Sequence, residues 1–511
     1  MAREQFLVYR QPAPIRGLDT SKPEDQLSPL FYPDGLNVDT DNNAIEKAGG
    51  YTQLLAGFPT AKKVMEGVEY GDSSGNIHLA FATETTFVEY NSGGTWSDRS
   101  GGVNLTGDAD YPVFMVNVAG LSTDLLIVTN GKDPIKKWTG SGNWASLSLT
   151  GYTTLLAGCA IGAWGHLLLG DTTEDGTHKP YRLVFSNNGD SEDYSGVTAG
   201  FLNLIEDSEN SRIQTLLPLN QSIIAYKESA IYNVTYKGGR NGVYFAANPV
   251  LLNSGALSRK SVARLGNIDL HVVVTKDNIH LFDGFGFIKT FGSGNEYLGD
   301  RVKDFFFDDL NWSKRGQVFC QSIPQKQKVI IIYPAGASTV PNKALIWDWK
   351  VDAWHPWQFA DTGHSIIVSD QFFTTPKYLY GIDSDVMTLY SGYSHNGTAI
   401  NGYFRTALND FSSMDQRYGI QEKTTEFVEL ENSGTDPTVE VRGSNNIEIA
   451  PSFSSADTPT DDSGTFPITR AGSESVRETA RYISLKCSDD SSDAAFRIAK
   501  YNIFFRLRGR T

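Results

Sequence analysis

The stretch LHVVVTKDNIHLFDGFGFIKTF, from Leu270 to Phe291, shows the pattern that decides the fold of this chain. An apolar run, Val272 to Val274, is followed by the polar residues Lys276 to Asn278. A second apolar run, Ile279 to Phe282, ends at the pair Asp283–Gly284. Runs of Val, Ile and Phe bounded by Asp, Asn and Gly are typical of β-hairpins. We therefore predict a hairpin in this stretch.

The same pattern recurs along the chain. One marker residue in the first apolar run of each copy gives Leu79, Leu126, Leu168, Ile224, Val273, Ile331 and Leu379, at intervals of 47, 42, 56, 49, 58 and 48 residues. A lone hairpin cannot bury its apolar face, so the copies must pack on one another, and a period of about 40–50 residues is that of a four-stranded propeller blade. We predict an all-β fold with a six- or seven-bladed β-propeller. Separate β-sandwiches would show strands every ~8–12 residues without this longer period.

Three regions follow from this rhythm. Residues 1–55 contain five prolines between Pro12 and Pro33, which exclude a long regular element, so we predict an extended N-terminal arm that leads into a first strand. Residues 56–400 hold the repeats and form the predicted propeller. Residues 401–511 lack the rhythm but contain strand-like runs, which predict a C-terminal antiparallel β-sandwich. Within it, the Ser-, Thr-, Asp- and Pro-rich segment 451–478 is predicted to be an exposed loop.

The composition is that of an acidic globular protein. The chain has 511 residues, with 44 Lys and Arg against 59 Asp and Glu, and a formal net charge of −15. This balance argues against tight wrapping of nucleic acid, which needs a basic surface, and fits a wall past which a polyanion slides. No apolar run approaches the ~20 residues of a membrane helix, and the first residues lack the apolar core of a signal peptide. We expect no membrane span, and assembly in the cytoplasm.

A search for catalytic motifs finds none. The chain has no GxxxxGK[ST] loop, no HExxH and no GxSxG elbow. The acidic doublets Glu206–Asp207, Asp308–Asp309 and Asp489–Asp490 are sequence neighbours, which point to opposite faces of a strand and do not pair as acid and base. His271 and His280 share one predicted hairpin, where we expect both to be surface residues. We predict that the chain is not an enzyme and uses no cofactor.

One segment has the beginning of a calcium loop. Asp39, Asp41 and Asn43 have the spacing of its first ligands, but Ala44 and Gly50 stand where the loop needs its glycine and its bidentate glutamate. We therefore expect a polar turn between two strands and no metal site.

Four tryptophans crowd into eleven residues, namely Trp347, Trp349, Trp354 and Trp357. They have two interpretations. They can fill the wedge between adjacent blades, where large side chains are wanted, or they can form an exposed aromatic patch that binds sugars. We favour the core interpretation.

The C-terminus is basic in an otherwise acidic chain, with Arg497, Lys500, Arg506, Arg508 and Arg510. These charges can protect a solvated sheet edge, because charged side chains discourage strand pairing there. Alternatively, they can dock onto an acidic partner subunit.

Several segments resemble a β-propeller family among the structural proteins of tailed bacteriophages. They are Pro14–Leu54, RLVFSNNGDSEDY from Arg182, IIAYKESAIYNVTY from Ile223, GALSRKSVARLG from Gly255, VVTKDNIHLFDG from Val273 and the closing FRIAKYNIFFRLRGR from Phe496. Apart from the closing segment, the resemblance covers residues from about 14 to 360. It includes no residue with a catalytic role.

The resemblance implies a virion structural protein, of the tail-nozzle, head-to-tail adaptor or packaged-DNA-sealing hub type. Such proteins form homo-oligomeric rings, usually hexameric, at the tail or head–tail junction, in contact with other tail and adaptor proteins. Genomic DNA passes the ring only transiently, and the ring is assembled in the host cytoplasm. The chain is shorter than many nozzle proteins, so its position in the tail stays open. The alternative is a receptor- or glycan-binding propeller at the tail tip or fibre.

Overall fold

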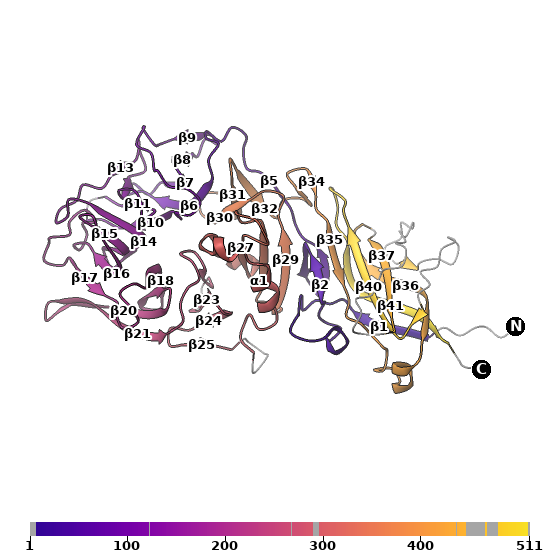
Figure 1. Ribbon diagram of the computed structural model, residues 1–511. Coiled ribbons are helices and arrows are strands. Elements are labelled where there is room, and N and C mark those ends of the chain that lie inside the picture. Colours follow the sequence, from indigo (N-terminus) through magenta and orange to yellow (C-terminus); the bar gives the residue numbers. More distant parts are fainter. Residues whose placement is uncertain are drawn as a thin grey trace.

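The computed structural model describes residues 7–121, 123–266, 268–289, 296–435, 437–445, 466–467 and 479–508. Within these ranges the protein is all-β (Figure 1). Its single α-helix there is α1 (Lys303–Asp309), beside short 3-10 turns at η1 (Glu24–Gln26), η2 (Trp312–Gln317), η3 (Pro324–Lys326) and η4 (Gln416–Ile420). The expectation of an all-β chain is confirmed.

Six successive segments each form a four-stranded antiparallel sheet whose strands follow chain order. The first three sheets are β6 (Val64–Gly71), β7 (Ile77–Thr83), β8 (Phe87–Tyr90) and β9 (Trp96–Asp98); β10 (Phe114–Val118), β11 (Leu125–Thr129), β12 (Lys136–Trp138) and β13 (Ala145–Ser146); and β14 (Leu155–Ala163), β15 (His166–Glu174), β16 (Thr177–Phe185) and β17 (Gly200–Asn203). The next three are β18 (Ile213–Leu219), β19 (Ser222–Lys227), β20 (Ala230–Arg240) and β21 (Val243–Leu252); β22 (Val262–Arg264), β23 (His271–Val274), β24 (Ile279–Phe282) and β25 (Phe287–Ile288); and β26 (Phe319–Ile323), β27 (Lys328–Tyr333), β28 (Lys343–Asp348) and β29 (Ala353–Gln358).

A seventh sheet combines distant parts of the chain. It runs β30 (Gly363–Ser369), β31 (Lys377–Ile382), β32 (Val386–Leu389), β5 (Tyr51–Gln53), β33 (Ser394–His395) and β34 (Thr398–Ala399). β5 pairs with β32, so a strand from before the first sheet completes the last one. The predicted hairpins are the second and third strands of each sheet, and all seven marker residues lie in a second strand and are buried.

The seven sheets form a closed circle. The first strands of successive sheets lie against one another from β6 to β30, and β30 in turn lies against β6. Apolar clusters fill each space between neighbouring sheets, for example Leu79 and Phe81 of the first sheet with Ile367 and Leu379 of the last. The core is thus a set of layers between sheets, because each sheet must bury both faces. This arrangement is that of a β-propeller.

Two further sheets contain the C-terminal region (yellow and orange in Figure 1). One holds β1 (Leu7–Pro12), β3 (Val38–Asp41), β4 (Ala44–Lys47), β36 (Lys423–Asn432), β38 (Phe466–Pro467), β39 (Thr479–Ala480) and β41 (Arg497–Leu507). The other runs β2 (Asp34–Leu36), β35 (Gly402–Arg405), β40 (Tyr482–Asp489) and β37 (Thr438–Ser444). Residues of both sheets share one core, including Ile503 and Phe505 of the first and Val441 and Leu485 of the second. Most of segment 451–478, the predicted loop, lies outside the described residues.

The N-terminal arm is more regular than its prolines suggested. It contributes β1, β2 and the β3–β4 hairpin to the two C-terminal sheets, and β5 to the propeller. The prediction of an irregular arm is wrong in this respect, because β1 ends at Pro12, the first proline, and β2 to β5 all follow Pro33, the last one. Residues 7–55 are therefore not a separate layer over a surface but parts of both neighbouring regions.

The arm also holds the two regions together along β29, the outer strand of the sixth sheet. The Leu18 N–H donates to the Trp354 carbonyl oxygen at 2.7 Å, and the Asn37 N–H donates to that of Pro356 at 2.9 Å. Gly17 lies against Trp354 with a φ of +76°, where an added Cβ would stand 2.3 Å from the Trp354 oxygen. Only glycine allows this approach. β2 thus lies between β29 and β35 and joins the propeller to the C-terminal sheets.

Candidate functional site

A narrow cavity of about 240 Å³ runs along the axis of the propeller. The first strands of all seven ring-forming sheets contribute to its wall. Most of its lining is apolar, as at Phe114, Ile161, Leu216 and Ile366. Ligand sites in proteins often combine such an apolar wall with a few polar groups, and here the polar groups include Arg259 and Lys260. This cavity is the candidate functional site.

Arg259 reaches from the start of the fifth sheet to two other sheets. Its Nη2 donates to Asp171 Oδ2 at 2.5 Å, and its Nη1 donates to the Asn130 carbonyl oxygen at 3.2 Å. Asp171 belongs to β15 of the third sheet, and Asn130 follows β11 of the second. The Arg259 side chain is 12% exposed and that of Asp171 only 2%. A charge-assisted bond between such groups is stronger than one on the surface, so it ties three sheets together.

Lys260 makes the corresponding contact with the first sheet. Its Nζ donates to Glu66 Oε2 at 2.6 Å and to the Met65 carbonyl oxygen at 2.8 Å, both in β6. The Nζ also lies 5.6 Å from the centre of the Phe114 ring. Together, Arg259 and Lys260 link the fifth sheet to the first, second and third. Two adjacent cations therefore line the axial cavity and contact three neighbouring sheets of the propeller.

The backbone that carries the two cations is held in place by its flanking serines. The Ser258 N–H donates to Ser261 Oγ at 2.9 Å, and Ser258 Oγ donates to the Val318 carbonyl oxygen. The Cys320 N–H donates to the Lys260 carbonyl oxygen at 2.8 Å, which anchors the turn to the sixth sheet. Short hydroxyl side chains favour such local backbone bonds. The sequence SRKS thus presents both cations to the axis from a fixed turn.

Asp171 owes its position to a bulge in β15. The register of β15 against β16 shifts between Gly170 and Thr172, and Asp171 has a φ of +56°. Such bulges redirect a side chain at the cost of local strain. The Asp171 carboxylate also accepts a bond from His178 Nε2 at 2.8 Å and lies 3.4 Å from Arg212 Nε. Three basic side chains therefore converge on one buried carboxylate.

A second hollow of about 610 Å³ lies where the β3–β4 hairpin meets the sixth sheet. Asp39 of the hairpin forms an ion pair with Lys328 of β27, and both are buried. Burial raises the pKa of Glu46 and of Asp348, and the carboxylate of Asp39 raises both further. Lys328 thus pairs with Asp39 at this junction, and Arg497 Nε lies 3.9 Å from Glu46 Oε2. The expected polar turn is confirmed, since Asn42 and Asn43 connect β3 and β4 with φ of 45° and 62°.

The tryptophan cluster lies mostly inside the protein. Trp347 and Trp354 belong to the core shared by the sixth sheet and the C-terminal sheets, Trp357 lies between the sixth and seventh sheets, and Trp349 is only partly buried. Trp357 Nε1 donates to the Val38 carbonyl oxygen of the arm at 2.9 Å. Trp354 Nε1 donates to that of Leu298 at 3.1 Å. These side chains anchor the arm and present no aromatic patch of four rings.

The basic C-terminal residues lie on a central strand. β41 pairs with β36 on one side and with β1 and β4 on the other, so the prediction of a sheet edge is wrong. Arg497 Nη2 lies 3.4 Å from Asp41 Oδ2, Lys500 pairs with Glu431, and Arg508 Nη1 lies 3.9 Å from Glu422 Oε2. Arg506 lies opposite Thr424 of β36, and Arg510 is outside the described residues. Three of the cations therefore have carboxylate partners within the chain.

The histidines of the fifth sheet are buried. Both His271 and His280 were expected on the surface, and that prediction is wrong because neighbouring sheets cover both faces of this one. His271 Nδ1 lies 2.7 Å from the Tyr226 hydroxyl, and its Nε2 lies 3.1 Å from the Pro218 carbonyl oxygen. Burial lowers the pKa of His271 to about 4. The ring is therefore neutral at pH 7.

Each acidic doublet has a member bound to lysine. Asp207 pairs with buried Lys227, Asp309 lies 2.9 Å from Lys343 Nζ, and Asp489 lies 3.7 Å from Lys47 Nζ. Burial raises the pKa of Asp207, but hydrogen bonds from Lys227 and neighbouring serines outweigh it and lower the pKa to about 2. A general acid needs a raised pKa instead. Asp207 is therefore an ion-pair partner.

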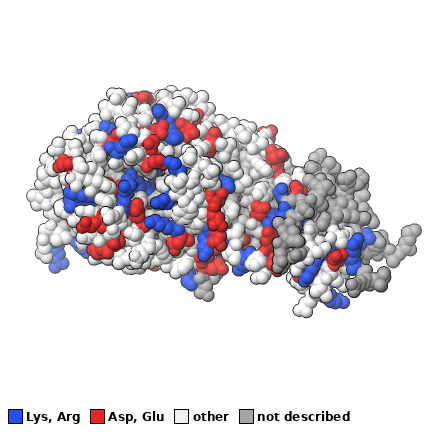
Figure 2. Space-filling view, in the orientation of Figure 1, with Lys and Arg blue, Asp and Glu red and all other residues white. Residues whose placement is uncertain are grey.

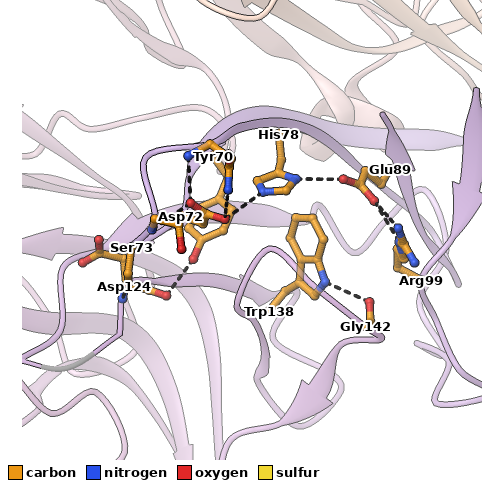
Figure 3. A network of polar contacts seen from close by, with 11 residues as sticks. Tyr70, Asp72, Ser73, His78, Glu89, Arg99, Asp124, Trp138 and Gly142 are labelled. Atoms are coloured by element: carbon orange, nitrogen blue, oxygen red, sulfur yellow. Dashed lines mark hydrogen bonds and ion pairs between the residues drawn. The ribbon is translucent and has the colours of Figure 1, made fainter. Parts of the chain in front are cut away.

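A further polar network joins the first two sheets at their rim (Figure 3). His78 lies between two carboxylates, with Nδ1 2.8 Å from Glu89 Oε1 and Nε2 3.3 Å from Asp72 Oδ2, and Arg99 binds the other oxygen of Glu89. Hydrogen bonds from Asn76 lower the pKa of Asp72 to about 2. The edge of the Trp138 ring packs on His78. The network links β6–β9 to the second sheet and involves no metal-type cluster.

The charges on the visible face of the molecule are mixed, with Lys and Arg interspersed among Asp and Glu (Figure 2). Within the described ranges, no group of three or more His, Cys, Asp or Glu side chains could hold a metal ion. No helix in those ranges is long and apolar enough to cross a membrane.

Comparison with known proteins gives structural neighbours only. No family model matches the chain, and no curated protein matches it. Among solved structures, it is similar to a streptogramin B lyase (9% identity, TM-score 0.40, covering 66% of this chain and 96% of that one) and to YCF48 bound to D1 peptide (11%, 0.40, 70% and 98%). It is also similar to the Pan2 WD40 domain of Neurospora crassa (7%, 0.38, 68% and 96%). Sequence identities this low do not allow a function to be inferred for this chain. The fold described above rests on the strand pairing of this chain.

Proposed function

We propose that this chain is a virion structural protein of a tailed bacteriophage, which forms an oligomeric ring of the tail or the head-to-tail connector around the DNA exit path. We further infer that the seven circularly packed sheets are seven blades of one propeller, and that the two C-terminal sheets form a β-sandwich. The chain order of the strands in six of the sheets, and the contacts that close the circle through the seventh, support the blade count. The common core of the two C-terminal sheets supports the sandwich.

One observation carries the proposal: two of the segments that resemble phage propeller proteins lock this fold together. GALSRKSVARLG places Arg259 and Lys260 across the axis. Pro14–Leu54 supplies strands that join both regions and the strand β5 that completes the seventh sheet. Such elements make a rigid body, which an assembly that transmits force or resists pressure needs.

The size of the axial cavity bears on where DNA would pass. A cavity of about 240 Å³ is far too small for a duplex. In the proposed ring, DNA therefore passes between the copies and not through any one propeller. The net charge of −15 supports such a role, because a wall of like charge lets a polyanion slide with few stops.

The first measurement is the molar mass of the full chain by light scattering, with imaging of the virus particle that contains it. We expect a closed oligomer on the tail axis whose interfaces exceed about 2,000 Å² each, as in obligate assemblies. A chain that stays monomeric at micromolar concentration and at the periphery of the particle would contradict the ring. That result would favour the alternative, receptor or glycan binding at the tail tip, although the mostly buried tryptophans give it no evident site.

A further inference from the structure

The β20–β21 hairpin is unlike the other outer hairpins of the propeller. Its strands have eleven and ten residues, whereas the outer strands β9, β13, β17, β25 and β29 have two to six. It lies at the end of the molecule opposite the C-terminal sheets (Figure 1). Its tip turns through Asn241 and Gly242, with φ of 54° and 76°, which is the combination that favours a tight two-residue hairpin turn. The hairpin is therefore a long projection, whose register shifts between Tyr236 and Arg240 just before the tip.

The base of the hairpin is rigid. Tyr236 of β20 stacks on Trp164 of the third sheet with ring centres 5.5 Å apart, and Phe245 of β21 packs on Tyr236 at 5.3 Å. Phe245 is buried. Aromatic contacts of this kind fix direction as well as adding stability. The tip is thus presented at a defined angle.

The tip is basic and free of internal partners. Lys237 and Arg240 are exposed, and within the described ranges neither forms an ion pair. Most other cations around the propeller do have partners, as at Arg259, Lys260 and Lys343. In a chain of net charge −15, two unpaired cations on a projection are the groups that an acidic surface would attract.

The outer edge of β21 is open and uncharged. Its sequence, VYFAANPVLL, contains no Asp, Glu, Lys or Arg, and in the described part of the chain its only strand partner is β20. Val243 and Leu252 at its ends are 45% and 47% exposed. Natural proteins usually protect such edges with charge, shortness or a covering element. Pro249 and a register shift interrupt its second half, so the open edge is Val243 to Asn248.

We propose that the β20–β21 hairpin docks on an acidic surface of a second copy of this chain, and this inference rests on the proposed ring. Two copies of charge −15 repel each other over most of their surfaces, so contact is favourable where one copy presents cations and an uncharged edge. Nucleic acid is a poor alternative partner, because two cations contribute little affinity. With two phosphate contacts, the logarithm of the binding constant would fall with the logarithm of salt concentration with a slope of only about −2. Docking from one end of the molecule onto a different surface of the next copy is heterologous, which is the geometry that closes rings.

The test compares two charge-reversed full-length chains by light scattering over a concentration series. K237E/R240E should weaken association at least about tenfold, because it replaces attraction by repulsion at the contact. K22E/K276E is the matched control, since it makes the same change in net charge at two other exposed lysines. Thermal melting should show both variants folded like the wild type. Ala246→Glu, on the open edge, should weaken association as well, because it adds a negative charge at the contact with an acidic surface.

The outcomes separate the hairpin from the ring. An oligomeric wild type with unchanged mass in K237E/R240E would overturn the docking role and leave the ring intact. Equal weakening by both double variants would also overturn it, because the effect would then be one of general charge. A monomeric wild type would contradict both proposals. As a direct readout, carbodiimide should join Lys237 to a carboxylate of the neighbouring copy in the wild-type oligomer, identified by mass spectrometry of mixed isotope-labelled chains.

Discussion

At the scale of single residues, two side chains at the propeller axis, Arg259 and Lys260, link the fifth sheet to the first three sheets. Arg259→Met would leave nearly buried Asp171 without its closest cation, and we expect the free energy of unfolding to fall by about 3 kcal/mol. Lys22→Met, at an exposed position, should cost less than about 0.5 kcal/mol. Denaturant melts followed by tryptophan fluorescence measure both. Equal midpoints for the two variants would show that the axial ion pairs do not hold the sheets together.

Buried histidines make stability depend on pH. Burial lowers the pKa of His271, His355 and His395 to about 4 each, against about 6.5 when unfolded. Between these values the unfolded chain binds more protons, so the contribution of these histidines to stability is constant above pH 6.5 and falls as the pH drops from 6.5 to 4. Melting temperatures across this range should decline, and His271→Gln should make the decline shallower. An equally steep decline of melting temperature with falling pH in His271→Gln and in the control His178→Gln would contradict this account.

At the scale of elements, β5 is the strand on which the last sheet depends. Tyr51 is fully buried, donates to Asp361 Oδ2 at 2.7 Å and stacks on His395 with ring centres 4.6 Å apart. Tyr51→Ala should cost about 3–5 kcal/mol through the cavity it leaves, and Tyr51→Phe about 1 kcal/mol through one lost hydrogen bond. Hydrogen exchange should speed up first in β30–β32. Uniform acceleration over all sheets would mean that β5 does not close the ring.

At the scale of the whole molecule, the arm makes the propeller and the C-terminal sheets one body. A chain that begins at residue 56 would lack β1 to β5, and with them one strand of the second C-terminal sheet, three of the first and the closing strand of the propeller. We expect it to be largely insoluble, or to melt well below the full chain, because buried faces and strand edges would be exposed. Soluble yield and thermal melting measure this. A cooperative melt at the temperature of the full chain would contradict the joining role.

Much of the fold was predictable because it depends on apolar runs that alternate with polar turns over short stretches of the chain. Apolar runs and Asn-, Asp- and Gly-rich turns specify hairpins through nearest neighbours alone, so the second and third strands of each sheet and their spacing followed from the sequence. The outer and arm strands were harder to see. Most of them are short, and some contain a proline. The arm strands form only because a distant strand supplies the backbone partners for pairing, as β41 does for β1.

The sequence by itself determined the all-β class, the repeat and the absence of local catalytic motifs, because these depend on residues close together in the chain. The tertiary structure alone decided which side chains meet. Arg259 and Lys260 look like two surface charges between strands, and only the closing of the circle brings them to the axis beside Asp171 and Glu66. The basic residues of β41 likewise lie on a central strand, because β1, β4 and β36 pair with both of its edges, and Arg497 and Lys500 have carboxylate partners within the chain. Contacts between residues hundreds of positions apart depend on how the layers pack, and no local pattern encodes that.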